Sequence, residues 1–185
     1  MSAVLVLPLA GMPELTAGED LVALLIQAAD RGAEGLRPGD VLVVTSKALS
    51  KVLDLTEPAA TDRQALVLAQ SRRVLVERRV GADSITRIVE SLAGPVMAAA
   101  GIDGSNTGAE HRWLLLPRDP DAEARRLRQD LLARSGWPAD TPLAVIVSDT
   151  AGRAWRAGLV DIAVGAAGIA VFEDCLLYTS PSPRD

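Results

Sequence analysis

Short apolar runs recur along the chain and predict buried β-strands. Val4–Leu7 is expected to form a short buried strand near the start of the chain. Val41–Val44 and Leu143–Val147 are apolar at every position and rich in β-branched residues, which is typical of strands inside a sheet. Trp113–Leu116 is expected to be a further strand.

Between these runs, apolar residues recur at helical spacing. The first expected helix covers residues 19–32, and its apolar face repeats at positions i, i+3, i+4 and i+7 (Leu21, Leu24, Leu25, Ala28). A second helix is expected to begin at Thr61 and a third to cover residues 119–136. The segments 74–76 and 85–92 fit either a helix or a strand.

Strands and helices are mixed along the chain, and no internal repeat or flexible linker divides it. We therefore expect one compact domain of the α+β (mixed α/β) class over residues 1–174. Residues 175–185 differ from the rest, because they hold the only Tyr, the only Cys and a Ser-Pro-Ser-Pro stretch. We expect them to be a disordered or artefactual tail.

The composition excludes several classes of protein. A chain with 49% hydrophobic and 23% charged residues is typical of globular proteins, and a net charge of −5 argues against a basic face that binds nucleic acid. No apolar run approaches the roughly 20 residues of a membrane span. The single cysteine, Cys175, excludes an internal disulfide. We expect a cytoplasmic protein without nucleic-acid or membrane partners.

The basic residues are unevenly distributed. Seventeen are Arg and only two are Lys, namely Lys47 and Lys51, and the chain holds a single Asn, Asn106. In a sequence so biased toward Arg, a retained lysine indicates a position that needs a compact ammonium group and not a planar guanidinium. Chance is the alternative explanation.

Polar clusters follow two of the predicted inner strands. Thr45-Ser46-Lys47, with Lys51 beyond it, follows Val41–Val44, where hydroxyl and ammonium groups can hold phosphate oxygens. A solvated loop is the alternative, since the chain contains no Walker A pattern and no G-x-G-x-x-G. Ser148-Asp149-Thr150 follows Leu143–Val147, and its oxygen atoms can either present a metal ion to phosphate or cap a turn.

A third polar cluster lies in a glycine-rich segment, Gly101–Asn106. Its carboxylate, Asp103, stands between two glycines and beside a hydroxyl and an amide. Oxygen ligands of this kind suit Mg²⁺ or Mn²⁺, but the same residues are typical of an Asx turn without a ligand.

In this order, the clusters resemble the coenzyme F420-0:L-glutamate ligase family. The similarity covers about residues 3–173, and the Ala- and Arg-rich style is similar to the actinobacterial form. It is carried by motifs at 11–14, 44–51, 100–106, 114–121, 147–156 and 160–165.

The resemblance implies a fold and a reaction. Members of the family use GTP and Mg²⁺ or Mn²⁺, with K⁺ as a further candidate ion. They join L-glutamate to the lactyl carboxylate of coenzyme F420-0 through an acyl phosphate, and then add further γ-linked glutamates. The resemblance also implies a homodimer, and a domain of this family's type that is incomplete at its C-terminus, because members run on for roughly another 70 residues.

The resemblance also implies roles for single residues. The implied nucleotide contacts are Met12, Pro13, Glu14, Leu15, Ser46, Lys47, Lys51 and Asn106. The implied metal ligands are Asp103, Asp149 and Thr150, and catalysis is assigned to Asp149 and Lys51. Two other functions stay open at this point: a nucleotide- or metal-binding module without turnover, and a metal-dependent phosphohydrolase.

Overall fold

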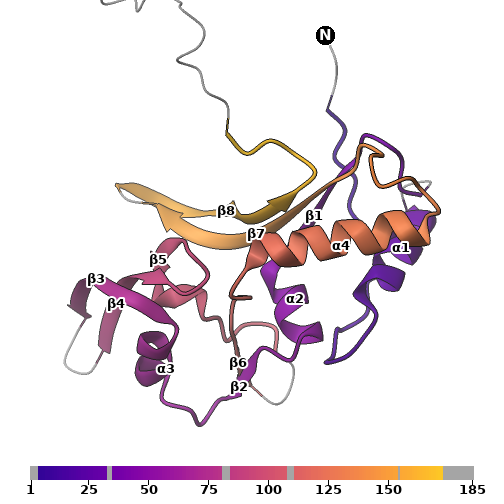
Figure 1. Ribbon diagram of the computed structural model, residues 1–185. Helices are drawn as coiled ribbons and strands as arrows, with labels where there is room; N and C mark the ends of the chain where they lie inside the picture. Colours follow the sequence, from indigo (N-terminus) through magenta and orange to yellow (C-terminus); the bar gives the residue numbers. More distant parts are fainter. Residues whose placement is uncertain (1–3, 33–34, 81–83, 108–110, 154, 173–185) are drawn as a thin grey trace, which may run out of the picture.

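The computed structural model describes residues 4–32, 35–80, 84–107, 111–153 and 155–172 (Figure 1). The helices are α1 (Leu21–Gly32), α2 (Ser46–Val52), α3 (Arg63–Ala69) and α4 (Pro120–Arg134), with a 3-10 turn η1 (Ala99–Gly101). The strands are β1 (Val41–Thr45), β2 (Thr56–Pro58), β3 (Ser71–Val80), β4 (Ser84–Ser91), β5 (Val96–Ala98), β6 (Arg112–Leu114), β7 (Ala144–Arg153) and β8 (Arg156–Ala167). The predicted α+β class and single compact domain are confirmed.

The larger core lies between one sheet and three helices. The sheet has the order β1-β7-β8, in which β7 pairs parallel with β1 and antiparallel with β8. The helices α1, α2 and α4 lie together on one side of this sheet (Figure 1). Val145 and Val147 of β7 are completely buried against side chains such as Leu131 of α4. This packing holds the ends of β1 and β7 in place.

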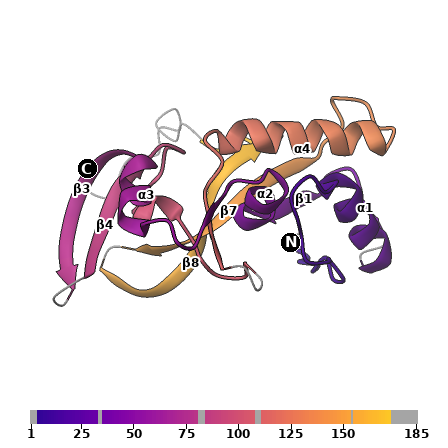
Figure 2. The same ribbon diagram turned by 90° about the horizontal axis from the view of Figure 1, so that it is seen from below.

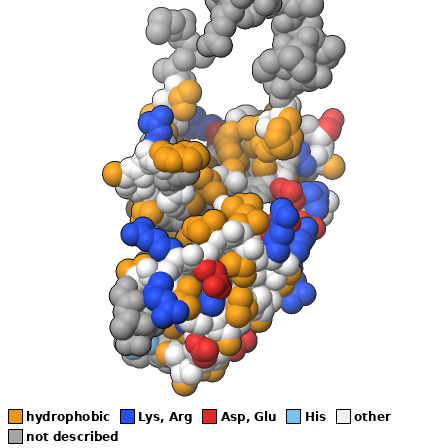
Figure 3. Space-filling view, turned by 90° about the vertical axis from the view of Figure 1, so that its left-hand side faces the viewer, with side chains coloured by type: hydrophobic (Ala, Val, Ile, Leu, Met, Phe, Trp, Pro, Cys, Tyr) orange, Lys and Arg blue, Asp and Glu red, His pale blue; other side chains and the backbone are white. Residues whose placement is uncertain are grey.

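A smaller antiparallel sheet occupies the opposite end of the molecule from α1 (Figure 2). Its order is β3-β4-β5, and α3 packs beside it over a small core that includes Val67 and Val89. The outer strand β3 is solvent-exposed over nearly its whole length. Seen from that end, hydrophobic and basic side chains are intermixed on the surface (Figure 3). No helix in the described part of the chain is long and apolar enough to cross a membrane.

Two of the expected buried strands differ from the prediction. Val4–Leu7 is not a strand, and its side chains are exposed, Val4 to 91%. Val41–Val44 does form β1, but the prediction of an inner strand is wrong. In the part of the chain that the structure describes, β1 has β7 as its single neighbour, and its residues alternate between exposed and buried. An apolar β-branched run indicates a strand but does not say how many neighbours it has. Leu143–Val147 is confirmed as an inner strand within β7.

The longer helices are confirmed, with small shifts at their ends. Helix α4 begins where Asp119 accepts a hydrogen bond from the Ala122 amide, with Pro120 at the first helical position. The helix expected from Thr61 begins instead at Arg63, because Asp62 caps it by accepting from the Gln64 amide. The undecided segments 74–76 and 85–92 lie in β3 and β4, and only the first half of Trp113–Leu116 is a strand. The predicted tail 175–185 lies outside the described residues.

The sequence patterns do not predict helix α2. They indicate a polar cluster that holds phosphate oxygens or a solvated loop at these residues. It follows β1 without an intervening residue and lasts seven residues. Its buried residues include Ser46, Ala48, Leu49 and Ser50, so half of this buried face is polar. A short helix with hydroxyls on its inner face lacks the apolar stripe that predicts a helix.

Glycine 165 lets α4 approach the sheet closely. A Cβ added at Gly165 of β8 would lie 2.4 Å from the backbone carbonyl carbon of Pro120 and 2.4 Å from its oxygen. No side chain fits there without moving the helix away from the strand.

Replacing Gly165 with alanine should therefore destabilise the fold. We expect Gly165→Ala to lower the free energy of unfolding by about 1–3 kcal/mol, because the added methyl group overpacks a backbone contact. Gly152→Ala in the neighbouring strand is the matched control, since the nearest atom to its added Cβ would be 3.9 Å away. Urea denaturation measures both variants. Equal stability of the two variants would contradict the packing argument.

Candidate functional site

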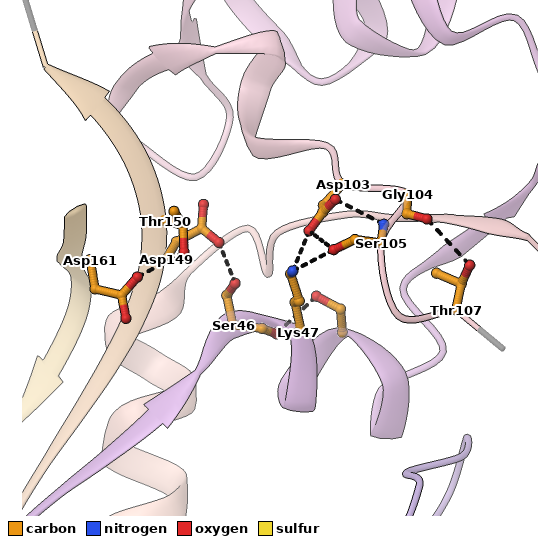
Figure 4. Close-up of polar contacts among 10 residues, drawn as sticks. Ser46, Lys47, Asp103, Gly104, Ser105, Thr107, Asp149, Thr150 and Asp161 are labelled. Atoms are coloured by element: carbon orange, nitrogen blue, oxygen red, sulfur yellow. Dashed lines mark hydrogen bonds and ion pairs between the residues drawn. The ribbon is translucent and has the colours of Figure 1, made fainter. Parts of the chain in front are cut away.

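The carboxyl ends of β1 and β7 bring two polar clusters together. The parallel register pairs Thr45 with Ser148. The residues that follow them, Ser46 and Asp149, therefore lie side by side. The Ser46 hydroxyl donates a 2.7 Å hydrogen bond to Oδ1 of Asp149 (Figure 4). Both residues are buried, with 2% and 8% of their surface exposed. A carboxylate is therefore held below the surface at the end of the sheet.

The glycine-rich cluster lies on the other side of Lys47 (Figure 4). Lys47 Nζ lies 2.5 Å from Oδ2 of Asp103 and donates a 2.6 Å hydrogen bond to Ser105 Oγ. The Ser105 amide and hydroxyl both donate to Asp103, at 2.9 and 2.8 Å. This is the Asx turn that was one alternative for the segment, and it presents the Asp103 carboxylate to α2.

A pocket of about 470 Å³ opens beside α2. Its lining residues are Pro13, Glu14, Leu15, Thr45, Lys47, Ala48, Lys51 and Asn106. Six of the eight residues predicted to contact nucleotide therefore surround one cavity. Of the other two, Met12 packs against the larger core and Ser46 lies beneath the surface.

A second pocket, of about 420 Å³, shares Glu14, Leu15 and Lys51 with the first. An ion pair between Lys51 and Glu14 lies at this common wall. The second pocket is also lined by Thr16, Ala17, Asp54, Thr56, Thr107, Arg112 and Leu114, none of which the sequence interpretation assigned to a site. Leu114 begins one of the motifs that carry the resemblance, but the other six residues lie outside those motifs and come from separate segments, so no local pattern points to them.

The two aspartates of the site have opposite pKa shifts. Burial raises the pKa of the Asp149 carboxyl, and the negative charge of Asp103 adds to this, although the hydrogen bond from Ser46 works against it. Burial also acts to raise the pKa of Asp103, but the hydrogen bonds from Lys47 and Ser105 outweigh it, so that pKa is lower than usual. Asp103 is paired with a lysine, whereas the buried Asp149 has no ion-pair partner among the described residues, and the nearby charge of Lys47 lowers its pKa less than burial raises it.

The third predicted metal ligand lies elsewhere. Thr150 follows Asp149 in β7, and successive side chains of a strand point to opposite faces. Its hydroxyl donates a 2.7 Å hydrogen bond to Asp161 of β8, the residue directly across the hairpin. The structure thus brings Asp103 and Asp149 toward the same region but does not bring the Thr150 hydroxyl to them. In the described ranges, no three acidic, histidine or cysteine side chains cluster as a metal cage.

The donor set nevertheless fits a hard divalent cation. Asp103 and Asp149 offer carboxylate oxygens, which Mg²⁺ and Mn²⁺ prefer, and water or substrate oxygens commonly complete the shell of such ions. A cation there would also compensate the buried Asp149 charge. The sequence interpretation placed Ser105 in the cluster around Asp103, and the structure shows that Ser105 donates both of its hydrogen bonds to that carboxylate. It did not predict that Asp161 accepts a hydrogen bond from Thr150, which follows from the register of the hairpin.

The opposite shifts predict opposite effects of neutralising each aspartate. Because the pKa of Asp149 is raised above 3.8 by folding, its ionised form destabilises the fold above the folded pKa but not at pH values below 3.8. With metal ions chelated, we expect Asp149→Asn to stabilise the chain at pH 7, because the substitution removes the buried negative charge. The gain should disappear near pH 3, as thermal unfolding at a series of pH values would measure.

Asp103→Asn is the matched comparison. The lowered pKa of Asp103 contributes stability that is present above 3.8 and is lost as the pH falls through the folded pKa. The substitution should therefore destabilise the chain at pH 7, modestly because the side chain is 36% exposed. Effects of the same sign for the two variants would contradict this account of the charges.

Comparison with known proteins identifies relatives over almost the whole chain. Residues 11–176 match the model of the F420-0:Gamma-glutamyl ligase family. The coenzyme F420:L-glutamate ligase of Methanothermobacter thermautotrophicus is 36% identical over 182 residues, which is 89% of this chain and 68% of that protein. The enzyme of the same name from Archaeoglobus fulgidus is 35% identical over 91% of this chain and 69% of its own length.

A third relative with this name, from Methanopyrus kandleri, is 34% identical over 85% of the chain. The chain spans 64–69% of the length of these three relatives. The family match and the identity over this length agree with the motifs that surround α2. The chain belongs to the F420-0:gamma-glutamyl ligase family.

Proposed function

We propose that this chain acts in a GTP- and divalent-metal-dependent ligase that joins L-glutamate to the lactyl carboxylate of coenzyme F420-0. Further γ-linked glutamates and an acyl phosphate intermediate are part of the proposal. Membership of the family supports glutamate ligation to this coenzyme. GTP and the metal ion are supported by the chemistry of the site alone.

The observation that carries the proposal is the arrangement of charges along α2. Lys47 and Lys51 are separated by one helical turn, so both side chains reach the same pocket. Asp103 contacts Lys47, and Asp149 contacts the preceding residue of α2, Ser46. Ammonium groups suit a polyphosphate chain, and paired carboxylates suit the cation that accompanies it.

Each lysine of the pocket is paired with a carboxylate. Lys47 pairs with Asp103, and Lys51 pairs with Glu14. A bound phosphate chain would compete for these ammonium groups, and the lysines would keep it in place by neutralising its charge. The ion pairs hold both lysines at the wall of the pocket, which reduces the entropy that their side chains would lose on binding a nucleotide.

Asp103 and Asp149 would hold the divalent cation. When bound, such an ion neutralises the charge that develops on transferred phosphoryl oxygens. Asp149 contributes because it is anchored in the sheet and its position does not depend on a loop. Because Asp149 is buried, little water surrounds its carboxylate, and the attraction between this carboxylate and a cation is stronger than it would be at the surface.

The ligase reaction predicts that phosphate release depends on both acceptor substrates. Incubation with GTP and Mn²⁺ should release phosphate only when L-glutamate and coenzyme F420-0 are both present, because the carboxylate must accept the phosphoryl group and the amine must then displace it. A colorimetric phosphate assay with each component omitted in turn measures this. Release from GTP and Mn²⁺ alone at the same rate would contradict the ligase and support a phosphohydrolase.

The metal assignment predicts the effect of Asp149→Asn on nucleotide binding. We expect calorimetric titration with GDP in the presence of Mn²⁺ to show affinity reduced at least roughly ten-fold, because the cation loses an anionic ligand. Asp161→Asn is the matched control on the opposite face of the same hairpin, and it should bind like the unmodified chain. Loss of affinity in Asp161→Asn but not in Asp149→Asn would place the cation on the Thr150 face and contradict the assignment.

A further inference from the structure

We infer that Ser46 is a positioning residue for Asp149 and that its side chain is not a nucleotide contact. This inference rests on the proposed function, because it concerns the proposed metal ligand. It assigns to Ser46 a role different from the one that the sequence resemblance implied.

The burial of Ser46 separates it from its neighbours along the chain. Thr45, Lys47 and Ala48 line the first pocket, whereas Ser46 does not and is only 2% exposed. On the first turn of α2, Lys47 points toward Asp103 and Ser105, while Ser46 points toward β7 (Figure 4). A nucleotide in the pocket meets the side chain of Lys47 and not that of Ser46.

The Ser46 hydroxyl has a single proton, which it uses in the hydrogen bond to Asp149. The bond to Oδ1 of Asp149 is 2.7 Å long and joins residues 103 positions apart in the chain. A carboxylate turns readily about its terminal bond, and a hydrogen bond to one oxygen fixes the direction of the other. Ser46 supplies the side-chain hydrogen bond that, with the bond from the Thr150 backbone, sets the angle at which Asp149 offers an oxygen to a cation.

The backbone makes this contact rigid. Ser46 is the first residue of α2, directly after β1, and Thr45 is paired in register with Ser148. Donor and acceptor are therefore both anchored to adjacent parallel strands, without a loop on either side of the hydrogen bond. Groups that orient metal ligands in this way commonly contribute 10–100-fold to metal affinity.

Ser50 offers a control within the same helix. It lies one turn after Ser46 and is equally buried, at 2%. Its hydroxyl is 2.9 Å from the carbonyl oxygen of Ser46 and 2.6 Å from that of Leu115, and neither contact involves Asp149. Replacing either serine with alanine removes a hydroxyl oxygen from an equally buried position of α2. Only the change at Ser46 removes a hydrogen bond to the Asp149 carboxylate.

Binding of Mn²⁺ to the whole chain tests the inference. It is measured without nucleotide, from the electron paramagnetic resonance signal of the Mn²⁺ that stays free. Ser46→Ala should weaken Mn²⁺ binding by roughly 10–100-fold. Ser46→Thr keeps the hydroxyl and should restore most of the affinity. Ser50→Ala should bind Mn²⁺ like the unmodified chain, even where thermal unfolding shows that it is less stable.

Three results would overturn the inference. Unchanged Mn²⁺ affinity in Ser46→Ala would show that the hydroxyl does not orient the ligand, although the proposed metal site would stand. Equal losses in Ser46→Ala and Ser50→Ala would show that packing of α2, and not the hydrogen bond, maintains the site. An unmodified chain that takes up no Mn²⁺ would overturn the proposed metal site, and the role of Ser46 with it.

Discussion

The parallel pairing of β1 with β7 is the contact on which the candidate site depends. It joins segments about a hundred residues apart and aligns their carboxyl ends. Strand β1 stops at Thr45 while β7 continues to Arg153, so the chain of α2 occupies the space beside the second half of β7. Asp149 lies one residue past the last pair of this ladder, where it contacts the first residue of α2.

Two long-range ion pairs then assemble the rest of the site around α2. Lys47 contacts Asp103 from the glycine-rich turn, and Lys51 contacts Glu14 from the N-terminal loop. Each lysine thus draws a different segment of the chain to the same short helix. Asp149 has no comparable cation among the described residues, and its buried charge is a cost to stability that function explains better than folding does.

The sequence predicted the elements whose signals are local. The residues 19–32 and 119–136 carry an apolar helical face or a capping residue, and both form helices. Sequence patterns predicted burial wrongly where burial depends on neighbouring elements. The residues of Val41–Val44 do not indicate that one face of the strand is exposed. The residues of Val4–Leu7 do not indicate that this segment lies exposed outside the described sheets.

For the candidate site, the sequence predicted which residues gather around one pocket, but it did not predict how their side chains are oriented. Most of the predicted nucleotide contacts surround one pocket, because the N-terminal loop and the glycine-rich segment both pack against α2 at the end of β1. The hydrogen bond from Ser46 to Asp149 and the opposite orientation of Thr150 depend on register and on strand pleating, which no motif encodes. The nucleotide, the metal ion and the homodimer stay predictions.

The direct junction of β1 and α2 has a consequence for how this region can vary. Loops ordinarily absorb inserted or deleted residues, but here strand and helix are consecutive, at Thr45 and Ser46. One extra residue would rotate the helix by about 100°, since a turn contains 3.6 residues, and would exchange the buried and pocket-facing sides of α2. Changes of length are therefore excluded from this junction, and the chain can vary here only by substitution.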